Sequence, residues 1–257
     1  MKTAGRYKVV RLIGLGATSF VYLAVDPNPP PRAVAVKVLP PSGRSRADRE
    51  WEIGSRVDHP NVNRVLERTE VYDQPALVME YAPGLHLAKW MQEKPGTDAF
   101  MSVFRHLLAG LGYLHGQGVV HRDVKPENVM VAPDGKARII DFDLATTAKE
   151  SHGLNRMAAG TVAFISPEQV RGEPLDPRSD LYAAGVILYW GLTGEVPFSG
   201  DSVEEVLRAH LRDRPRPPGS IRTDEVRAGN DEIALRLLEK SPAARYQSAE
   251  EVLEALG

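Results

Sequence analysis

The hydrophobic pattern of this chain changes period once, close to residues 80–84. Before that point, five segments rich in Val, Ile, Leu and Tyr are bounded by turn residues, as β-strands are: "YKVVRLIG", "FVYLAVD", "AVAVKVL", "NRVLERTEVY" and "PALVMEY". Beyond it, apolar residues recur at spacings of three and four, as in "DAFMSVFRHLLAGLGYLH". This change predicts an α+β chain with a small strand-rich lobe over residues 1–80, a connection over 80–84 and a larger, mainly helical lobe over 85–257.

Further helices follow from local composition. The segment "SRADREWEIGSRVDH" has the charge density of a short exposed helix within the strand-rich part, whereas "PNPPPR" is a loop because proline cannot donate to a strand ladder. In the second part, apolar periodicity predicts helices over residues 179–192, 202–212, 231–238 and 249–256.

Composition excludes several classes of protein. The 257 residues are 42% hydrophobic and 26% charged, which is typical of a globular domain, and a formal net charge of -2 gives no basic face for nucleic acid. Zero cysteines exclude disulfides, thiolate metal sites and thiol nucleophiles. The most apolar run, "LYAAGVILYWGL", is too short for a membrane span, which needs about 20 residues, and indicates a buried helix. We expect a cytoplasmic location.

A glycine turn between the first two strands could approach phosphate. In "GLGATSFV", Gly14 and Gly16 carry no side chain that would keep the backbone from an anion. The turn alone is weak evidence, since an ordinary hairpin has similar composition, and it is no dinucleotide-binding fingerprint because a strand follows it. Lys37, which ends "VAVK" one strand later, could reach the same phosphates.

The segment "HRDVKPEN" carries the strongest chemical signal. Asp123, Lys125 and Asn128 lie within six residues around a proline, and packing does not explain this polar cluster. Asp141 follows Asn128 by thirteen residues, after the apolar "ARII". Asp and Asn offer the hard oxygen ligands that Mg²⁺ accepts, while an aspartate that binds no metal could take a proton from an attacking hydroxyl.

These motifs, in this order, resemble those of eukaryotic-type serine/threonine protein kinases, including bacterial ones: glycine loop, "VAVK", "HRDVKPEN", "DFD" in place of DFG, and "SPE" in place of APE. The resemblance covers about residues 7–256 and implies a bilobal kinase fold for the whole chain. It implies that Lys37 holds the ATP phosphates and pairs with Glu50, or failing that Glu52. It further implies that Asp123 is the catalytic base, that Lys125 neutralises the moving phosphoryl group, and that Asn128 and Asp141 hold Mg²⁺, with Mn²⁺ as an alternative.

The resemblance also implies a nucleotide pocket, with Met79 as the gatekeeper. Its residues would be Ile13, Gly14, Gly16, Val21, Ala35, Lys37, Met79, Glu80, Tyr81, Ala82 and Met130. The structural residues that it implies are Arg122, Phe142, Asp180 below the catalytic loop, and Glu168 paired with Arg245.

The implied reaction is transfer from ATP to proteins. Lys125 and Thr161 resemble the residues of serine/threonine kinases and not those of tyrosine kinases, so the expected acceptors are serine and threonine hydroxyls. The activation segment, 141–168, contains the candidate phosphoacceptors Thr146, Thr147 and Ser151. It also contains Thr161, the threonine that resembles the one in serine/threonine kinases. A phosphate there would meet Arg122 and order the segment. Bacterial relatives form homodimers through the small lobe, a possibility that this sequence leaves open.

Two residues depart from the family pattern. Asp143 replaces the glycine of DFG, although aspartate tolerates positive φ better than most residues. Because the five catalytic and metal-binding residues that the resemblance implies are all present, we expect an active enzyme: Lys37, Glu50, Asp123, Asn128 and Asp141. Gly54 replaces a larger apolar residue, so we expect a gap beside Phe142, a mobile helix and a separated Lys37–Glu50 pair. Asn63 is a smaller anomaly, at a place where an apolar residue is expected.

Two alternatives remain open. A pseudokinase would follow if Asp143 or Gly54 prevents assembly of the site. A small-molecule phosphotransferase would share the catalytic and metal aspartates, although such enzymes lack the full motif series.

Overall fold

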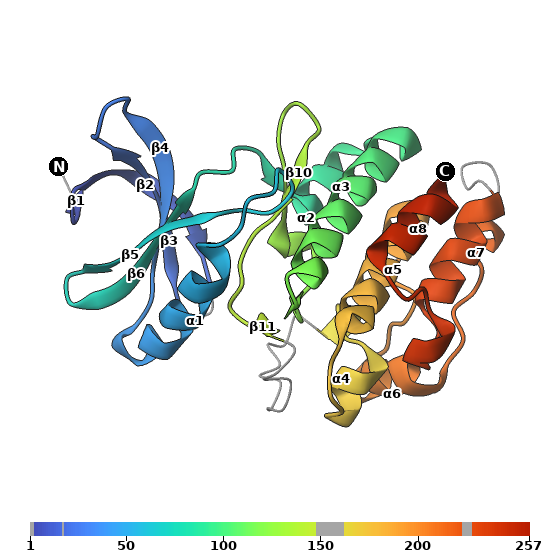
Figure 1. Ribbon diagram of the computed structural model, residues 1–257. Coiled ribbons are helices and arrows are strands. Elements are labelled where there is room, and N and C mark those ends of the chain that lie inside the picture. The colour runs from blue at the N-terminus through green and yellow to red at the C-terminus, as the bar shows by residue number, and fades with distance from the viewer. Residues whose placement is uncertain (1–2, 17, 148–161, 223–227) are drawn as a thin grey trace.

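The chain folds into two lobes, described by a computed structural model over residues 3–16, 18–147, 162–222 and 228–257. A twisted sheet with the helix α1 (Arg44–Gly54) forms the lobe that contains the N-terminus, and a bundle of helices forms the lobe that contains the C-terminus (Figure 1). The predicted two-lobed α+β arrangement is therefore correct.

The small lobe is built on a six-stranded antiparallel sheet with the order β1-β2-β3-β4-β6-β5. Its strands are β1 (Thr3–Ala4), β2 (Tyr7–Leu15), β3 (Phe20–Asp26), β4 (Arg32–Val38), β5 (Val65–Val71) and β6 (Gln74–Glu80). The β4 strand lies inside the sheet, where Lys37 is opposite Val21 of β3 and Leu77 of β6. This register directs a lysine into the interior.

Helix α1 (Arg44–Gly54) packs against β5 and β6, next to the short 3-10 helix η1 (Pro41–Gly43). Its buried residues, Ala47, Glu50, Ile53 and Gly54, recur at spacings of three and four and so form one face. The sequence predicted a short exposed helix here, and one face of it is in fact buried. Glu50 lies on that buried face.

The large lobe is centred on two long helices, α3 (Thr97–Gly116) and α5 (Pro177–Thr193). Nearly all of α5 is buried, as the run "LYAAGVILYWGL" predicted. The remaining helices are α2 (Leu87–Trp90), α4 (Pro167–Arg171), α6 (Val203–Arg212), α7 (Ala228–Leu237) and α8 (Ala249–Leu256). Short 3-10 helices are η2 (Met91–Glu93), η3 (Pro126–Asn128), η4 (Val162–Phe164), η5 (Pro218–Ser220) and η6 (Pro242–Ala244).

Five very short strands, which the sequence pattern did not predict, lie in the large lobe: β7 (Leu85–His86), β8 (Val119–Val120), β9 (Val129–Val131), β10 (Ala137–Ile139) and β11 (Thr146–Thr147). They form the sheets β10-β9-β7 and β11-β8. The β9–β10 hairpin follows Asn128 and precedes Asp141, so it fixes the spacing of these two residues in space.

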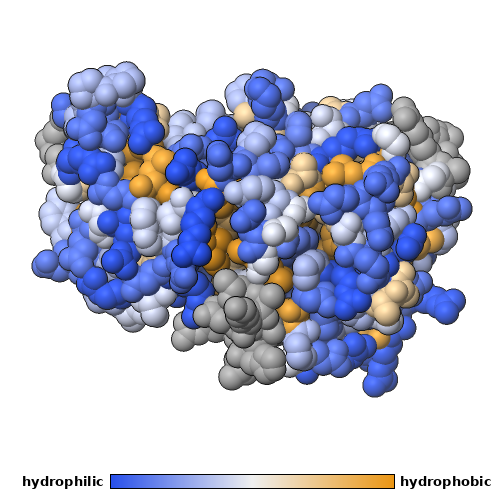
Figure 2. Space-filling model, in the orientation of Figure 1, coloured by the Kyte–Doolittle hydropathy of each residue, from blue (hydrophilic) through white to orange (hydrophobic). Residues whose placement is uncertain are grey.

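Within the described ranges, every helix is too short or too polar to cross a bilayer. The face of the molecule in Figure 2 is mainly hydrophilic, and its hydrophobic residues show in separate small areas.

Candidate active site

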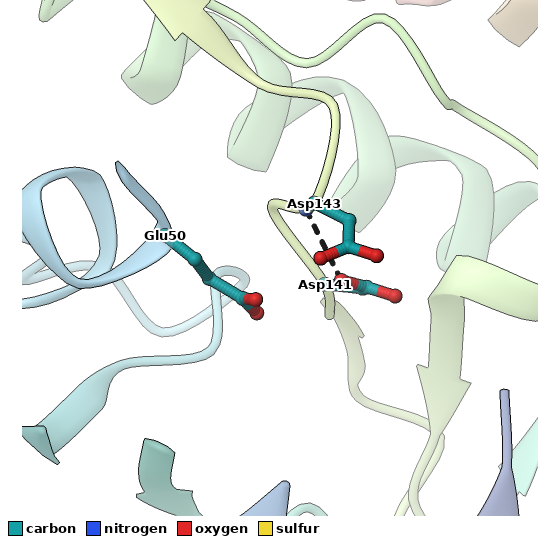
Figure 3. A group of neighbouring side chains, drawn as sticks. All are labelled: Glu50, Asp141 and Asp143. Carbon is teal, nitrogen blue, oxygen red and sulfur yellow. Dashed lines mark hydrogen bonds between the residues drawn. The ribbon is translucent and has the colours of Figure 1, made fainter. Parts of the chain in front are cut away.

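Lys37 lies at the centre of a cluster of three carboxylates contributed by α1 and by the turn after β10. Its Nζ is 2.8 Å from Glu50 Oε2, 2.7 Å from Asp141 Oδ1 and 3.3 Å from Asp143 Oδ1. Figure 3 shows Glu50 reaching from α1 toward the two aspartates. Burial alone would lower the pKa of Lys37, but Glu50, Asp141 and Asp143 together raise it well above its ordinary value. The lysine is therefore a fixed cation.

The prediction of a separated Lys37–Glu50 pair is wrong, because the gap expected at Gly54 is filled. A Cβ at Gly54 would lie only 2.2 Å from Val65 Cγ2 and 3.4 Å from Phe142 Cδ2. The side chain of Val65 thus occupies the space that a larger residue would need, and α1 packs directly on β5. Burial raises the pKa of Glu50, although the Lys37 ammonium opposes this change.

The choice of Glu50 over Glu52 agrees with the geometry. The Glu50 side chain is fully buried, whereas that of Glu52 is 64% exposed and lies 3.6 Å from the Arg56 guanidinium. Glu52 thus pairs along the outer surface of the helix.

The three polar residues of "HRDVKPEN" converge as the sequence predicted. Lys125 Nζ donates to Asp123 Oδ2 at 2.6 Å, and Asn128 Nδ2 donates to the Asp123 carbonyl and to its Oδ2 at 2.8 and 2.9 Å. The loop also contains an unusual backbone geometry, since Arg122 has a φ of 69°. The contacts of Lys125 and Asn128 with Oδ2 fix the orientation of the Asp123 carboxylate.

Asp180, in the first turn of α5, holds this loop from below. Its carboxylate accepts hydrogen bonds from the backbone N–H groups of His121 and Arg122, both at 2.8 Å, and lies 2.9 Å from His115 Nε2. Burial would raise the pKa of Asp180, but the hydrogen bonds and the nearby histidines hold it below its ordinary value. The predicted position of Asp180 beneath the catalytic loop is thus observed.

Asp141 and Asn128 are held close to one another by the backbone. The N–H of Ile140 donates to the Asn128 carbonyl at 2.8 Å, and the N–H of Asp143 donates to Asp141 Oδ1 at 3.2 Å. Asp141 adopts a φ of 72°, and Phe142 is buried with its ring centroid 6.0 Å from that of His121. Burial would raise the pKa of Asp141, but the Lys37 ammonium lowers it.

These two residues fit a divalent cation with oxygen preference. The amide nitrogen of Asn128 donates to Asp123, so the amide oxygen is the atom that could bind a cation, and Asp141 offers a carboxylate whose pKa is lowered. This donor set is one that Mg²⁺ accepts in proteins.

The residues expected around the nucleotide lie on β2, β3, β4, β6, β9 and the connection after β6. Gly14 pairs with Val21, Ala35 pairs with Met79, and Met130 lies on β9. At Gly16 a Cβ would approach Ser19 Oγ to 2.6 Å, so a larger residue would require the Ser19 side chain to move. Of the remaining expected residues, Ile13 lies within β2, two residues before that strand ends at Leu15. Glu80 is the last residue of β6, and Tyr81 and Ala82 follow it in the connection between the lobes.

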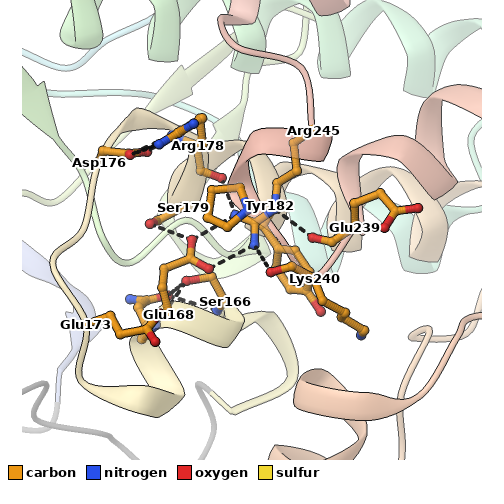
Figure 4. Close-up of polar contacts among 12 residues, drawn as sticks. Ser166, Glu168, Glu173, Asp176, Arg178, Ser179, Tyr182, Glu239, Lys240 and Arg245 are labelled. Carbon is orange, nitrogen blue, oxygen red and sulfur yellow. Dashed lines mark hydrogen bonds and ion pairs between the residues drawn. The ribbon is translucent and has the colours of Figure 1, made fainter.

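The predicted ion pair between Glu168 and Arg245 is present and buried (Figure 4). Arg245 Nη1 and Nη2 donate to Glu168 Oε1 and Oε2 at 2.7 and 2.8 Å, and Ser179 Oγ donates to Oε1 at 2.7 Å. Burial would raise the pKa of Glu168, yet these donors lower it. The contact fastens α4 to the helical lobe.

The candidate phosphoacceptors have different positions. Thr146 is 5% exposed within β11, so its hydroxyl is not accessible in this conformation. Ser151 and Thr161 lie outside the described residues, as does the side chain of Thr147.

Sequence reasoning left Asn63 unexplained and did not single out Arg46. Asn63 Nδ2 donates to the Glu80 carbonyl at 3.1 Å and its N–H donates to the Ile139 carbonyl at 2.8 Å, which explains a polar residue at this place. Arg46 contacts Asp143 and Thr18. Arg46 lies four residues before Glu50, so the helical period could have placed both on neighbouring surfaces.

The chain is similar to several bacterial proteins. It is 37% identical over 262 residues to the serine/threonine-protein kinase PknB of Mycobacterium tuberculosis. This match covers 96% of this chain and 42% of that protein. Two probable serine/threonine-protein kinases, of Streptomyces coelicolor and Clostridium acetobutylicum, are 36% and 34% identical; each match covers 98% of this chain, and 39% and 40% of the respective relatives. The chain thus spans about two fifths of the length of these relatives.

The family comparison agrees with the geometry. Residues 7–255 match the family model described as protein kinase domain. This range includes the glycine turn, the Lys37 cluster, the catalytic loop and the Glu168–Arg245 pair, and the chain therefore belongs to the protein kinase family.

Proposed function

We propose that this domain transfers the γ-phosphoryl group of ATP to serine and threonine hydroxyls of protein substrates. The observation that carries the proposal is Lys37 bound at once by Glu50 of α1 and by Asp141 of the large lobe. This contact joins the phosphate-binding cation to the metal-binding turn. The printed names of the similar bacterial proteins support the same reaction and the same class of acceptor.

Each polar residue has a role in this proposal. Lys37 positions the α and β phosphates, Asp123 accepts the proton of the attacking hydroxyl, and Lys125 offsets charge on the transferred group. Asn128 and Asp141 would hold Mg²⁺, which supplies charge stabilisation at the phosphates when bound. The acceptor is a protein, and we place the reaction in the cytoplasm, where ATP is supplied.

Transfer from labelled ATP tests the proposal. The chain is incubated with Mg²⁺, and separately with Mn²⁺, together with a generic basic protein as acceptor, and labelled amino acids are identified after hydrolysis. We expect label on serine or threonine, and Asp123→Asn should lower the rate by about 10²- to 10⁴-fold. Absence of transfer with either metal, alongside intact nucleotide binding, would refute the enzyme and leave a nucleotide-binding scaffold.

We also propose that the domain phosphorylates its own activation segment. Thr147, Ser151 and Thr161 are the candidate acceptors, because the hydroxyl of Thr146 is buried. A phosphate brings about -1.5 to -2 charges near neutral pH and would pair with Arg122. Peptide mass spectrometry of active protein should find the modification, and an active protein with an unmodified segment would contradict it.

A further inference from the structure

Asp143 is not an isolated substitution, because its carboxylate connects three parts of the site. One oxygen, Oδ1, lies 3.3 Å from Lys37 Nζ, and the other, Oδ2, lies 3.3 Å from Arg46 Nη1 on α1. Arg46 Nη2 in turn donates to Thr18 Oγ1 of the glycine loop at 2.7 Å. A continuous polar chain thus runs from the turn after β10, through α1, to the glycine loop.

The charge balance requires such a partner. Lys37 already contacts Glu50 and Asp141, so Asp143 adds a third carboxylate to one ammonium group. An extra negative charge beside the place of a triphosphate would repel it, since like charges at close range raise the free energy of the bound state. Arg46 contributes the second cation of the cluster and contacts the oxygen of Asp143 that Lys37 does not contact.

The Arg46–Asp143 ion pair is partly buried, so its contribution to the free energy of binding should be measurable. The side chains of Arg46 and Asp143 are 26% and 25% exposed, so water screens them only in part. By contrast Arg44, two residues earlier on the same helix, pairs with Glu70 at the surface, with both side chains more than half exposed.

We propose that Arg46 and Asp143 form a paired positioning device of the nucleotide site. Asp143 anchors the guanidinium of Arg46, and Arg46 both neutralises Asp143 and holds the glycine loop through Thr18. The proposal rests on the ATP site proposed above and gives the aspartate of "DFD" a role that glycine could not have.

Single and double substitutions at Arg46 and Asp143 should have non-additive effects on nucleotide affinity. Removing Arg46 alone leaves the Asp143 carboxylate without its second cation and frees Thr18, so nucleotide affinity falls. Removing the Asp143 charge alone costs less, because the repulsion disappears together with the anchor. The substitution at Asp143 therefore suppresses the defect of the substitution at Arg46.

Measurement of the nucleotide Kd tests this non-additivity directly, and it does not depend on phosphoryl transfer. The probe is the fluorescent N-methylanthraniloyl derivative of ATP with Mg²⁺, titrated into wild type, Arg46→Ala, Asp143→Asn and the double variant. We expect Kd to rise about fivefold or more for Arg46→Ala, to stay within about twofold of wild type for Asp143→Asn, and to rise only about two- to threefold for the double variant, which still lacks the contact with Thr18. Thr18→Val should weaken binding by about two- to threefold, as expected for one lost hydrogen bond.

Matched variants separate positioning from folding. Arg44→Ala changes an arginine of the same helix that pairs away from the site, and its Kd should equal that of wild type. Arg46→Lys, which keeps the charge, should stay within about twofold of wild type, whereas Arg46→Gln should resemble Arg46→Ala. In steady-state transfer, Arg46→Ala should raise the KM for ATP and leave kcat nearly unchanged.

Each outcome is decisive. Defects that multiply in the double variant, or a normal Kd for Arg46→Ala and Arg46→Gln, would overturn the pairing while leaving the ATP site intact. Failure of wild type to bind the fluorescent nucleotide would overturn the ATP site itself and, with it, the role of the pair.

Discussion

Packing leaves no room for a side chain at Gly54. The residue ends α1 on its buried face, directly opposite Val65 of β5. Because the Val65 methyl group lies where a Cβ would be, the helix approaches the sheet more closely than a larger residue would allow. The closed Lys37–Glu50 pair depends on this approach, since Glu50 lies one turn earlier.

Gly54→Ala should therefore destabilise the fold. Overpacking costs about 1–3 kcal/mol, which exceeds the gain in helix propensity of up to about 1 kcal/mol. Urea denaturation should show a lower free energy of unfolding, and Gly54→Ala combined with Val65→Ala should recover part of the loss. Gly116→Ala, at the last residue of α3, is the control, since among the described residues nothing beyond the adjacent backbone lies within 4 Å of a Cβ built there. An equally stable Gly54→Ala would disprove the close contact.

His210 makes a titratable contribution to stability. Its ring is fully buried, its Nδ1 lies 2.9 Å from Tyr182 Oη, and its centroid lies 4.9 Å from that of Phe198. Burial, together with the positive charge of Lys240, lowers the pKa of His210 to about 3. The folded state thus holds this imidazole neutral at pH values where an unfolded histidine is protonated.

The sign of the pH dependence follows directly. The unfolded pKa is 6.5, so the contribution of His210 is present above pH 6.5 and is lost as the pH falls toward 3. Between pH 7 and pH 5 this loss amounts to about 2 kcal/mol of unfolding free energy. Urea denaturation at both pH values should show a smaller difference for His210→Gln than for wild type. Substitution of the exposed His86 by Gln should leave the difference unchanged, and equal slopes for all three proteins would contradict the assignment.

At the scale of elements, α5 orients the catalytic loop through its first turn. The helix begins after Asp176, whose side chain accepts from the Arg178 N–H, and this cap places Asp180 below the loop. A carboxylate is required there because two backbone donors and His115 converge on it. An amide would present one acceptor and one donor to these groups.

Asp180→Asn should consequently lower kcat more than nucleotide affinity. One loop N–H would face an amide NH₂, and misplacement of Asp123 should reduce transfer by about 10- to 100-fold. Because Lys37 and the glycine loop do not contact Asp180, the Kd for Mg·ATP should stay within about twofold of wild type. Single-turnover transfer measures the expected fall in rate, and direct nucleotide binding measures whether the Kd stays unchanged. A parallel loss of both quantities would instead indicate general unfolding of the loop.

At the scale of the whole molecule, the site is divided between the two lobes. Lys37 and Glu50 belong to the sheet lobe, whereas Asp123, Asn128 and Asp141 belong to the helical lobe (Figure 1). The Lys37–Asp141 ion pair crosses between them at 2.7 Å. A ligand that contacts both sets of residues should therefore stabilise the folded chain as a unit.

Mg·ATP should raise the free energy of unfolding by about 2.7 kcal/mol at a concentration 100 times its Kd. Thermal denaturation with ATP alone, with Mg²⁺ alone and with both checks this expectation, and removal of the metal with EDTA should reverse most of the shift. Lys37→Met should abolish most of the stabilisation because the phosphates lose their cation. A shift of the same size in Lys37→Met would place the nucleotide elsewhere.

Local patterns predicted much of the fold. Helix α8 has the predicted bounds, β3 matches "FVYLAVD", and α3 and α5 extend the predicted helices by one or two residues at each end. These elements are long or strongly periodic, so local hydrophobic spacing determines them. The two-residue strands β7, β8 and β11 were missed, because pairings between distant segments create them.

The sequence by itself determined which groups are available: a lysine on an apolar strand, a loop with Asp123, Lys125 and Asn128, and Asp141 after the apolar run "ARII". Their spacing along the chain is short enough for local structure to preserve it. Only the tertiary structure decided how Gly54 and Asp143 act. Val65 fills the space at Gly54, and Arg46 reaches Asp143 from a helix 97 residues earlier. Packing and charge pairing between distant segments leave no periodic trace in a sequence, so such contacts become evident only in the folded molecule.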